Sequence, residues 1–209
     1  MSSRSRPPRC SRCATRCCTP IPVRWTTACS TCIPSENRGT LTAGRKRGVM
    51  FSFLKGKQPP ALAAPLSGRV IPIDEVPDPV FAQKVLGDGV GIVPSDGALL
   101  APADGTVIQV AETLHAVGIE TADGLELLIH LGIDTVKLGG EGFRCLVKEG
   151  QKVKKGERLL EMDLAFLRGK GFDTTSPFII TNPDRVASLQ PLVGEAVAGE
   201  TTVLRYKMK

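Results

Sequence analysis

The sequence predicts an all-β protein, a compact antiparallel β-sandwich or barrel with one or two short helices. From Met50 onward, short apolar runs alternate with Gly, Pro and Asp at close spacing. Many short strands with regular turn signals are typical of a sandwich or barrel rather than of a doubly wound sheet. The glycines of residues 87–91 do not form a nucleotide-binding loop, because the Lys-Ser/Thr ending of a phosphate loop is missing there.

Each expected element follows from a local pattern. The apolar runs predict strands at residues 68–73, 89–93, 105–110, 115–120, 125–131, 143–147, 158–162, 178–181 and 202–206. One helix is expected at residues 164–170, because Asp163 is a suitable N-cap and Gly171 follows its end. Residues 78–83 predict a single helical turn.

Composition divides the chain at Met50. Residues 1–49 hold six of the seven cysteines and ten Lys+Arg against one acid, so their net charge is +9 and the remainder carries 17 − 20 = −3. The basic character therefore belongs to the leader and predicts no nucleic-acid partner for the folded part. Residues 50–209 suit one domain whose single cysteine, Cys145, permits no internal disulfide, and this favours the cytoplasm. The chain has no apolar run of the roughly 18 residues that a membrane span needs, so we expect no stable membrane insertion.

The leader, residues 1–49, allows several interpretations. Its spacing of Cys10, Cys13, Cys29 and Cys32 matches a zinc ribbon. Its Arg- and Ser-rich, acid-poor composition also resembles an organelle transit peptide. Because it offers little material for a core, we favour a disordered leader or a wrongly assigned start, with Met50 as the natural start.

The only two histidines, His115 and His130, lie on the two arms of one predicted β-hairpin. If residues 121–124 form the loop, His115 lies directly opposite His130, about 4.5–5.5 Å away between Cβ atoms. A two-residue Asp-Gly turn would instead leave the two rings diagonal on one face. Leu125, Leu127, Ile129 and Leu131 share the core face by the two-residue period, so His130 points away from the main core. The pattern predicts a shared site rather than two unrelated core histidines.

Three segments, residues 64–107, 112–143 and 147–164, resemble the glucose-type enzyme IIA domain of the bacterial phosphoenolpyruvate-dependent sugar phosphotransferase system. The most specific part is HLGIDTVKL at residues 130–138, around the family's phosphorylated histidine. The resemblance implies an antiparallel β-sandwich at residues 50–209. It also implies that His130 accepts a phosphoryl group from HPr and passes it to the cysteine of a permease IIB domain.

The resemblance also assigns roles around His130. His115 matches the second active-site histidine and Thr113 the hydroxyl residue two positions before it. The His115 ring N–H, the Thr113 hydroxyl and backbone N–H groups of residues 132–134 could bind the phosphoryl oxygens. No cofactor is required, although zinc could bind adventitiously at His115 and His130. The expected docking surface combines two carboxylates with apolar residues: Asp78, Asp134, Val80, Phe81, Ile133 and Val136.

Two other functional classes share parts of the pattern. A biotinyl or lipoyl carrier domain needs a modifiable Lys at a hairpin tip, and Glu161-Met162-Asp163 offers none. A LytM-type zinc endopeptidase needs three protein ligands with a His-x-His pair, which two isolated histidines cannot supply. The sequence does not reveal which sugar is served, because that specificity lies in the permease. The resemblance further implies that the unphosphorylated form could regulate transporters or metabolic enzymes.

Overall fold

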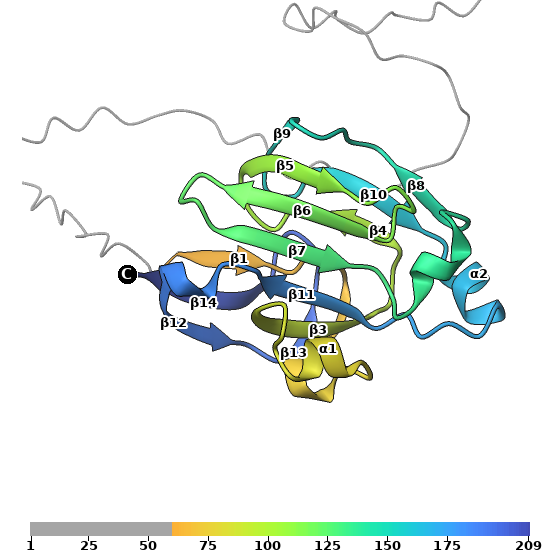
Figure 1. The fold of residues 1–209 in the computed structure, drawn as a ribbon, viewed down its shortest axis with the longest axis horizontal. Coiled ribbons are helices and arrows are strands. Elements are labelled where there is room, and N and C mark those ends of the chain that lie inside the picture. Colours follow the sequence, from red (N-terminus) through yellow and green to blue (C-terminus); the bar gives the residue numbers. More distant parts are fainter. Residues whose placement is uncertain (1–59) are drawn as a thin grey trace, which may run out of the picture. The chain divides into compact units, whose positions relative to one another are not determined.

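The computed structural model of the chain describes residues 60–209, so the predictions for residues 1–49 lie outside the described range. Its largest element is an antiparallel sheet of eight strands (Figure 1). In spatial order they are β13 (Gly194–Ala196), β2 (Gly68–Pro72), β3 (Asp88–Pro94), β11 (Ser176–Ile180), β7 (Glu126–His130), β6 (Ala116–Thr121), β5 (Gly105–Val110) and β9 (Lys152–Val153).

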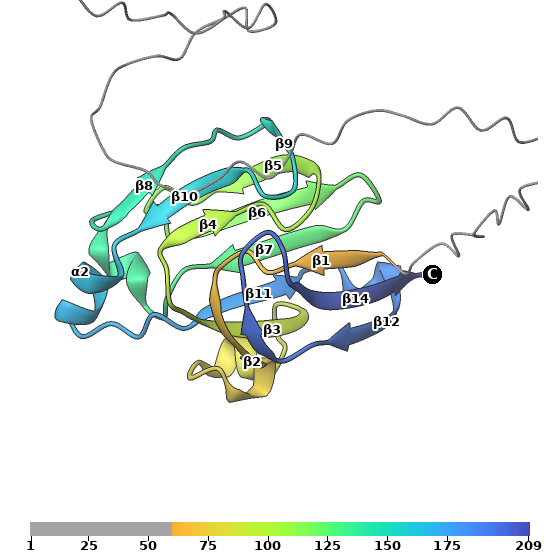
Figure 2. The same cartoon turned by 180° about the vertical axis from the view of Figure 1, so that it is seen from behind.

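Two antiparallel sheets of three strands complete the β-structure of the described residues. One contains β1 (Ala61–Ala63), β14 (Thr202–Met208) and β12 (Val186–Pro191), in that order. The other contains β4 (Ala98–Leu100), β10 (Arg158–Met162) and β8 (Phe143–Cys145). Both views show β4 and β10 layered against β5 and β6 of the large sheet (Figures 1 and 2). The predicted all-β class is confirmed.

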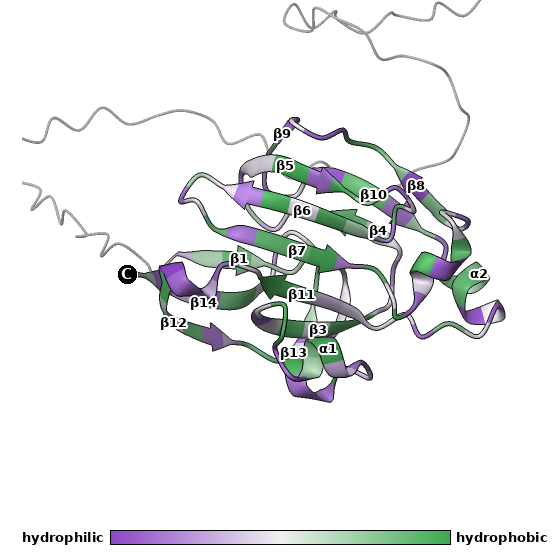
Figure 3. Ribbon diagram, viewed as in Figure 1, coloured by the Kyte–Doolittle hydropathy of each residue, from purple (hydrophilic) through white to green (hydrophobic). Residues whose placement is uncertain are grey.

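The core lies on both faces of the large sheet. Along β11, Phe178 and Ile180 belong to the main core, whereas Ile179 points to a smaller cluster on the other face. That smaller cluster is formed by Ile71, Ile73, Val76, Phe81 and Ile179. The four apolar residues at positions 125, 127, 129 and 131 are at most 1% exposed, as their alternation predicts. Figure 3 shows the hydropathy of the strands over these layers.

Both short helices begin at an aspartate cap, of which the sequence analysis predicted Asp163. In α2 (Leu164–Gly169), the Asp163 carboxylate accepts a hydrogen bond from the Phe166 N–H. In α1 (Pro79–Ala82), the Asp78 carboxylate accepts from the Val80 N–H. The structure also has single 3₁₀ turns, η1 (Ile73–Glu75), η2 (Thr135–Leu138) and η3 (Pro183–Arg185). Among the described residues no helix is long and apolar enough to cross a membrane.

Candidate functional site

The β6–β7 hairpin carries both histidines, but its register differs from the prediction. His130 pairs with Ala116, one residue away from the predicted partner, His115. The loop has three residues rather than four, because the Thr121 N–H bonds to the Leu125 carbonyl and Gly124 adopts a left-handed φ of 75°. The expectation that the histidines lie directly opposite each other is therefore wrong.

The two rings nevertheless meet, because the chain bends just before β6 begins. Leu114 has a positive φ of 55°, and the His115 carbonyl accepts a hydrogen bond of 2.7 Å from the Leu131 N–H. This bend turns the His115 ring toward His130 although the ladder itself would not. The ring centroids lie 4.9 Å apart with their planes at 71°. One small group can therefore contact both rings.

A backbone carbonyl fixes the proton of His130. The Nδ1 atom lies 2.8 Å from the Gly132 carbonyl oxygen. A carbonyl can only accept, so in the neutral ring Nδ1 carries the proton and Nε2 carries a free lone pair. Sequence reasoning missed this partner, because a main-chain oxygen leaves no side-chain signal. The half-buried ring thus presents a nucleophilic nitrogen.

His115 has a different partner. Its Nδ1 atom lies 2.5 Å from the Thr113 hydroxyl oxygen, so the structure brings together the three residues predicted to be catalytic. A hydroxyl can donate or accept, and both tautomers of His115 are compatible with this contact. When the hydroxyl donates, the His115 Nε2 carries a proton that it can give to an anionic oxygen.

Two of the three backbone N–H groups predicted as donors in the turn after His130 are engaged within the protein. The Gly132 N–H donates to the Ser176 hydroxyl at 3.2 Å, and the Ile133 N–H donates to the Asp173 carbonyl at 2.8 Å. These two N–H groups are therefore engaged within the protein and do not remain for a phosphoryl group. They hold the turn against Asp173 and Ser176, at the start of β11.

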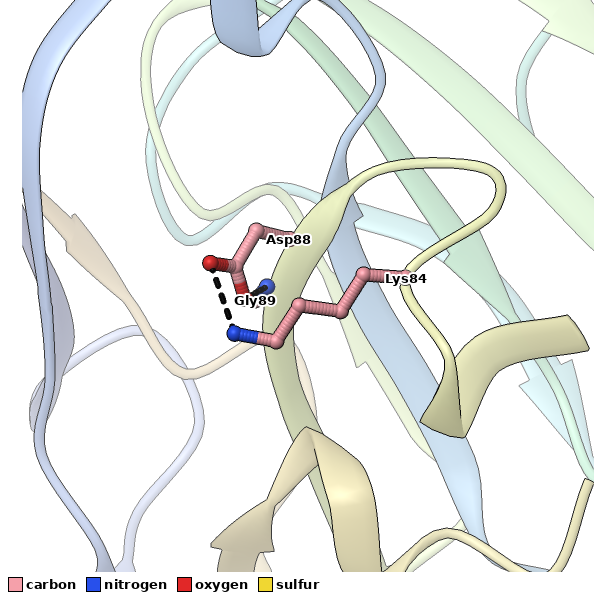
Figure 4. Close-up of polar contacts among 3 residues, drawn as sticks. All are labelled: Lys84, Asp88 and Gly89. Atoms are coloured by element: carbon pink, nitrogen blue, oxygen red, sulfur yellow. Dashed lines mark hydrogen bonds and ion pairs between the residues drawn. The ribbon is translucent and has the colours of Figure 1, made fainter. Parts of the chain in front are cut away.

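Phe81 forms the floor of the site beneath His130. Its ring centroid lies 5.1 Å from that of His130 with the planes tilted by 59°, and Phe81 is only 5% exposed. The loop after α1 is tied to β3 by the Lys84 ammonium, which donates to the Asp88 carboxylate at 3.0 Å; the same carboxylate accepts from the neighbouring Gly89 N–H at 2.8 Å (Figure 4). The floor is thus part of a packed element rather than a free side chain.

Burial favours the neutral form of both histidines. Desolvation lowers the pKa of His130 below its ordinary value, and the nearby His115 lowers it further. The hydrogen bond to Gly132 and the carboxylates of Asp78 and Asp134 act in the opposite direction without reversing the shift. Desolvation also lowers the pKa of His115. Neutral imidazoles are the nucleophilic form, so this shift suits His130.

The residues predicted to dock a partner fall into two groups. Val80 is 42% exposed and Val136 50% exposed, whereas Phe81 is buried and Ile133 half-buried against the smaller cluster. Asp78 and Asp134 flank His130 closely enough to affect its pKa, and Asp134 also pairs with the Lys137 ammonium at 2.6 Å. The surface around the histidines is therefore apolar at its exposed valines and charged beside them.

No cluster of three or more His, Cys, Asp or Glu side chains that could hold a metal ion occurs within residues 60–209. The predicted adventitious zinc would have only His115 and His130 from this chain, so it stays a prediction. The half-buried Cys145 donates to the Val147 carbonyl and packs against the main core. The site offers paired imidazoles, a hydroxyl and an aromatic floor, a combination that suits transfer of a small anionic group.

Residues 60–186 match the sequence model of a family described as the phosphoenolpyruvate-dependent sugar phosphotransferase system, EIIA 1. The chain belongs to this EIIA family. The predicted resemblance to the glucose-type enzyme IIA is therefore confirmed, and membership makes the chain a component of a sugar phosphotransferase system.

Individual relatives agree with this assignment. The chain is 47% identical over 149 residues to the glucose-specific EIIA component of Bacillus cereus, a match that covers 71% of this chain and 90% of the relative. It is 44% identical over 160 residues to the glucose-specific EIIA component of Staphylococcus aureus, with 75% and 96% covered. The structure of the glucose permease IIA from Mycoplasma capricolum matches with a TM-score of 0.66 and 37% identity, over 69% of this chain and 94% of that one.

Proposed function

We propose that this EIIA protein is a phosphoryl carrier that accepts phosphate from phospho-HPr on His130 and passes it to the cysteine of a permease IIB domain. The observation that supports this most is the hydrogen bond from His130 Nδ1 to the Gly132 carbonyl, which leaves the Nε2 lone pair free. In each transfer the P–N bond of the donor breaks as the new bond to the acceptor forms. His130 keeps its Nδ1 proton throughout.

His115 and Thr113 bind the phosphoryl group in this proposal. The Thr113 hydroxyl donates to His115 Nδ1, which places the single N–H proton of the neutral ring on Nε2. That N–H then donates to an equatorial oxygen of the phosphoryl group, where charge is spread in the transition state. A fixed donor of this kind stabilises developing charge without having to reorganise.

Docking of HPr and IIB uses the surface around the histidines. Val80 and Val136 supply exposed apolar contacts, and Asp78 and Asp134 supply negative charge beside them. Such a surface steers a basic partner and suits transient association. The buried Phe81 and the half-buried Ile133 support this surface from below.

The relatives' names favour a glucose-type system, with the sugar itself selected by the permease. The proposed carrier acts in the cytoplasm. The unphosphorylated form would be available to regulate transporters or metabolic enzymes. In this proposal residues 50–209 form the functional domain and residues 1–49 take no part in transfer.

A phosphoryl-transfer assay tests the separate roles proposed for the two histidines. Purified protein is incubated with labelled phosphoenolpyruvate, enzyme I and HPr, and then with a IIB domain. His130→Ala should abolish uptake of acid-labile phosphate. His115→Gln should still accept phosphate, because the nucleophile remains, but should pass it to IIB about 10²–10³-fold more slowly, as expected for loss of one transition-state donor.

Circular dichroism of both variants is the control for folding. If His130→Ala takes up phosphate while His115→Gln does not, the two roles are reversed. If both variants take it up, the phosphorylated residue is elsewhere and the proposal fails.

A further inference from the structure

The segment that leads into β11, residues 173–176, holds the turn whose carbonyl contacts His130. The Ser176 hydroxyl accepts from the Gly132 N–H at 3.2 Å and donates to the Thr174 carbonyl at 2.9 Å. Ser176 is 0% exposed, so water cannot replace either hydrogen bond. Neither of these hydrogen bonds involves a histidine.

Ser176 occupies the place where the backbone ladder between β7 and β11 stops. The last paired residues are Ile129 and Phe178. Continuing the register puts Pro177 opposite His130 and Ser176 opposite Leu131. Pro177 has no N–H and cannot continue the ladder. Beyond this point, the hydrogen bond from the Gly132 N–H to the Ser176 hydroxyl connects the end of β7 to the start of β11.

The peptide group that follows the Gly132 N–H connects Ser176 to the His130 ring. The peptide between Gly132 and Ile133 donates its N–H to the Asp173 carbonyl at 2.8 Å, and its own carbonyl accepts from His130 Nδ1. The N–H and the carbonyl of this planar peptide group are thus both hydrogen-bonded, and hydrogen bonds in such a chain polarise one another. Gly132 has a φ of +74°, and a Cβ there would lie 2.9 Å from the Asp173 carbonyl oxygen. The Gly132 turn therefore packs closely against residues 173–176.

We propose that Ser176 is a positioning residue that, through the Gly132 turn, holds the proton of His130 on Nδ1 and so keeps Nε2 free for phosphoryl transfer. The consequence for transfer rests on the proposed function, whereas the position of the proton can be measured in the unphosphorylated protein. Which ring nitrogen of a neutral histidine carries the proton is set by its hydrogen bonds, so the tautomer of His130 depends on how firmly the turn holds the Gly132 carbonyl.

The test compares Ser176→Ala with Thr121→Val. Thr121 is a matched control, because its buried hydroxyl also accepts a backbone N–H, that of Leu125 at 3.1 Å, at the opposite end of the same hairpin. The ¹⁵N chemical shifts of the His130 ring report the tautomer. The wild type and Thr121→Val should show one tautomer, with the proton on Nδ1. Ser176→Ala should shift the tautomer equilibrium toward Nε2–H by a factor of roughly 2 to 10, the net worth of one hydrogen bond.

Phosphorylation of Ser176→Ala by phospho-HPr should slow in proportion to the fraction of His130 that loses the Nδ1 proton, which is a smaller change than the shift of the equilibrium itself. Ser176→Cys, which keeps the shape with a weaker acceptor, should fall between the two and carries the test if the alanine variant does not fold. An unchanged tautomer in Ser176→Ala, or an equal shift in Thr121→Val, overturns the proposal. If the tautomer shifts but wild-type His130 takes up no phosphate, the proposed function fails while the positioning role stands.

Discussion

The chemistry of the site depends on the partner of each ring nitrogen. Both histidines were visible in the sequence as the only pair in the chain, and the hairpin placed them together. Their distinction comes from the Gly132 carbonyl at one ring and the Thr113 hydroxyl at the other. Thr113 was predicted through the family resemblance. The Gly132 carbonyl was not predicted, because every residue has such a group and only the fold decides where it points.

The lowered pKa of His130 predicts how stability depends on pH. The folded pKa lies below that of the unfolded chain, so the unfolded state binds more protons as the pH falls past the ordinary histidine value of about 6.5. The stabilising contribution of neutral His130 should be complete above about pH 6.5. The free energy of unfolding should decrease as the pH falls from there toward the pKa of His130 in the folded protein. Urea unfolding between pH 5 and 8 measures this.

The matched control for this prediction is His130→Gln, which cannot titrate. The variant should lose less stability than the wild type between pH 7 and pH 5. Equal losses in both proteins would show that His130 does not contribute to the pH dependence. A larger loss in the variant would mean that the pKa of His130 in the folded wild type is raised rather than lowered.

At the scale of elements, all nine predicted strands form, with bounds that move by a few residues. The sequence analysis missed β1, β4, β9, β12 and β13, and each of these lies at an edge of its sheet. Edge strands have one unpaired side, so they bury less and show a weaker apolar pattern. The hairpin register was missed for another reason: the residues at 121–124 are compatible with loops of two, three or four residues, and only the left-handed Gly124 decides among them.

The short helix α1 should be essential to the site through Phe81. Because this ring is buried among apolar residues and lies against His130, Phe81→Ala should destabilise the protein by about 3–5 kcal/mol. Phe81→Leu should remain folded but should accept phosphate more slowly, because the flat floor beneath the imidazole is lost. Thermal unfolding and the rate of phosphorylation by phospho-HPr measure the two effects.

Phe166→Leu in α2 is the matched control for that rate. It also removes an aromatic ring from a short helix, but one that packs against the main core, and Phe166 makes no aromatic contact with either histidine. The control should be phosphorylated at the wild-type rate. A wild-type rate in Phe81→Leu would show that the floor does not orient His130.

At the scale of the whole molecule, the site lies where separately packed elements meet. The end of β7 brings His130, the bend before β6 brings His115, and α1 brings Phe81. The main core fixes β6 and β7 from one face, and the smaller cluster supports α1 and the turn from the other. Two carboxylates come to the same place from residues 78 and 134, which are far apart in the sequence. The composition of the chain could predict a domain after Met50 but not this convergence, which depends on long-range strand pairing.

The final prediction concerns the domain boundary. The core of the described residues extends from Leu62 to Tyr206, and the Tyr206 N–H already bonds to the Pro60 carbonyl at 3.1 Å. A protein that starts at Met50 should therefore fold and accept phosphate like the full chain, with a melting temperature within about 2 °C. For a domain of this size, a drop of roughly 2–4 °C corresponds to about 1 kcal/mol and would show that residues 1–49 pack on the domain. Stoichiometric zinc in the full chain, lost when Cys10 and Cys13 are replaced by serine, would instead establish the ribbon interpretation of the leader.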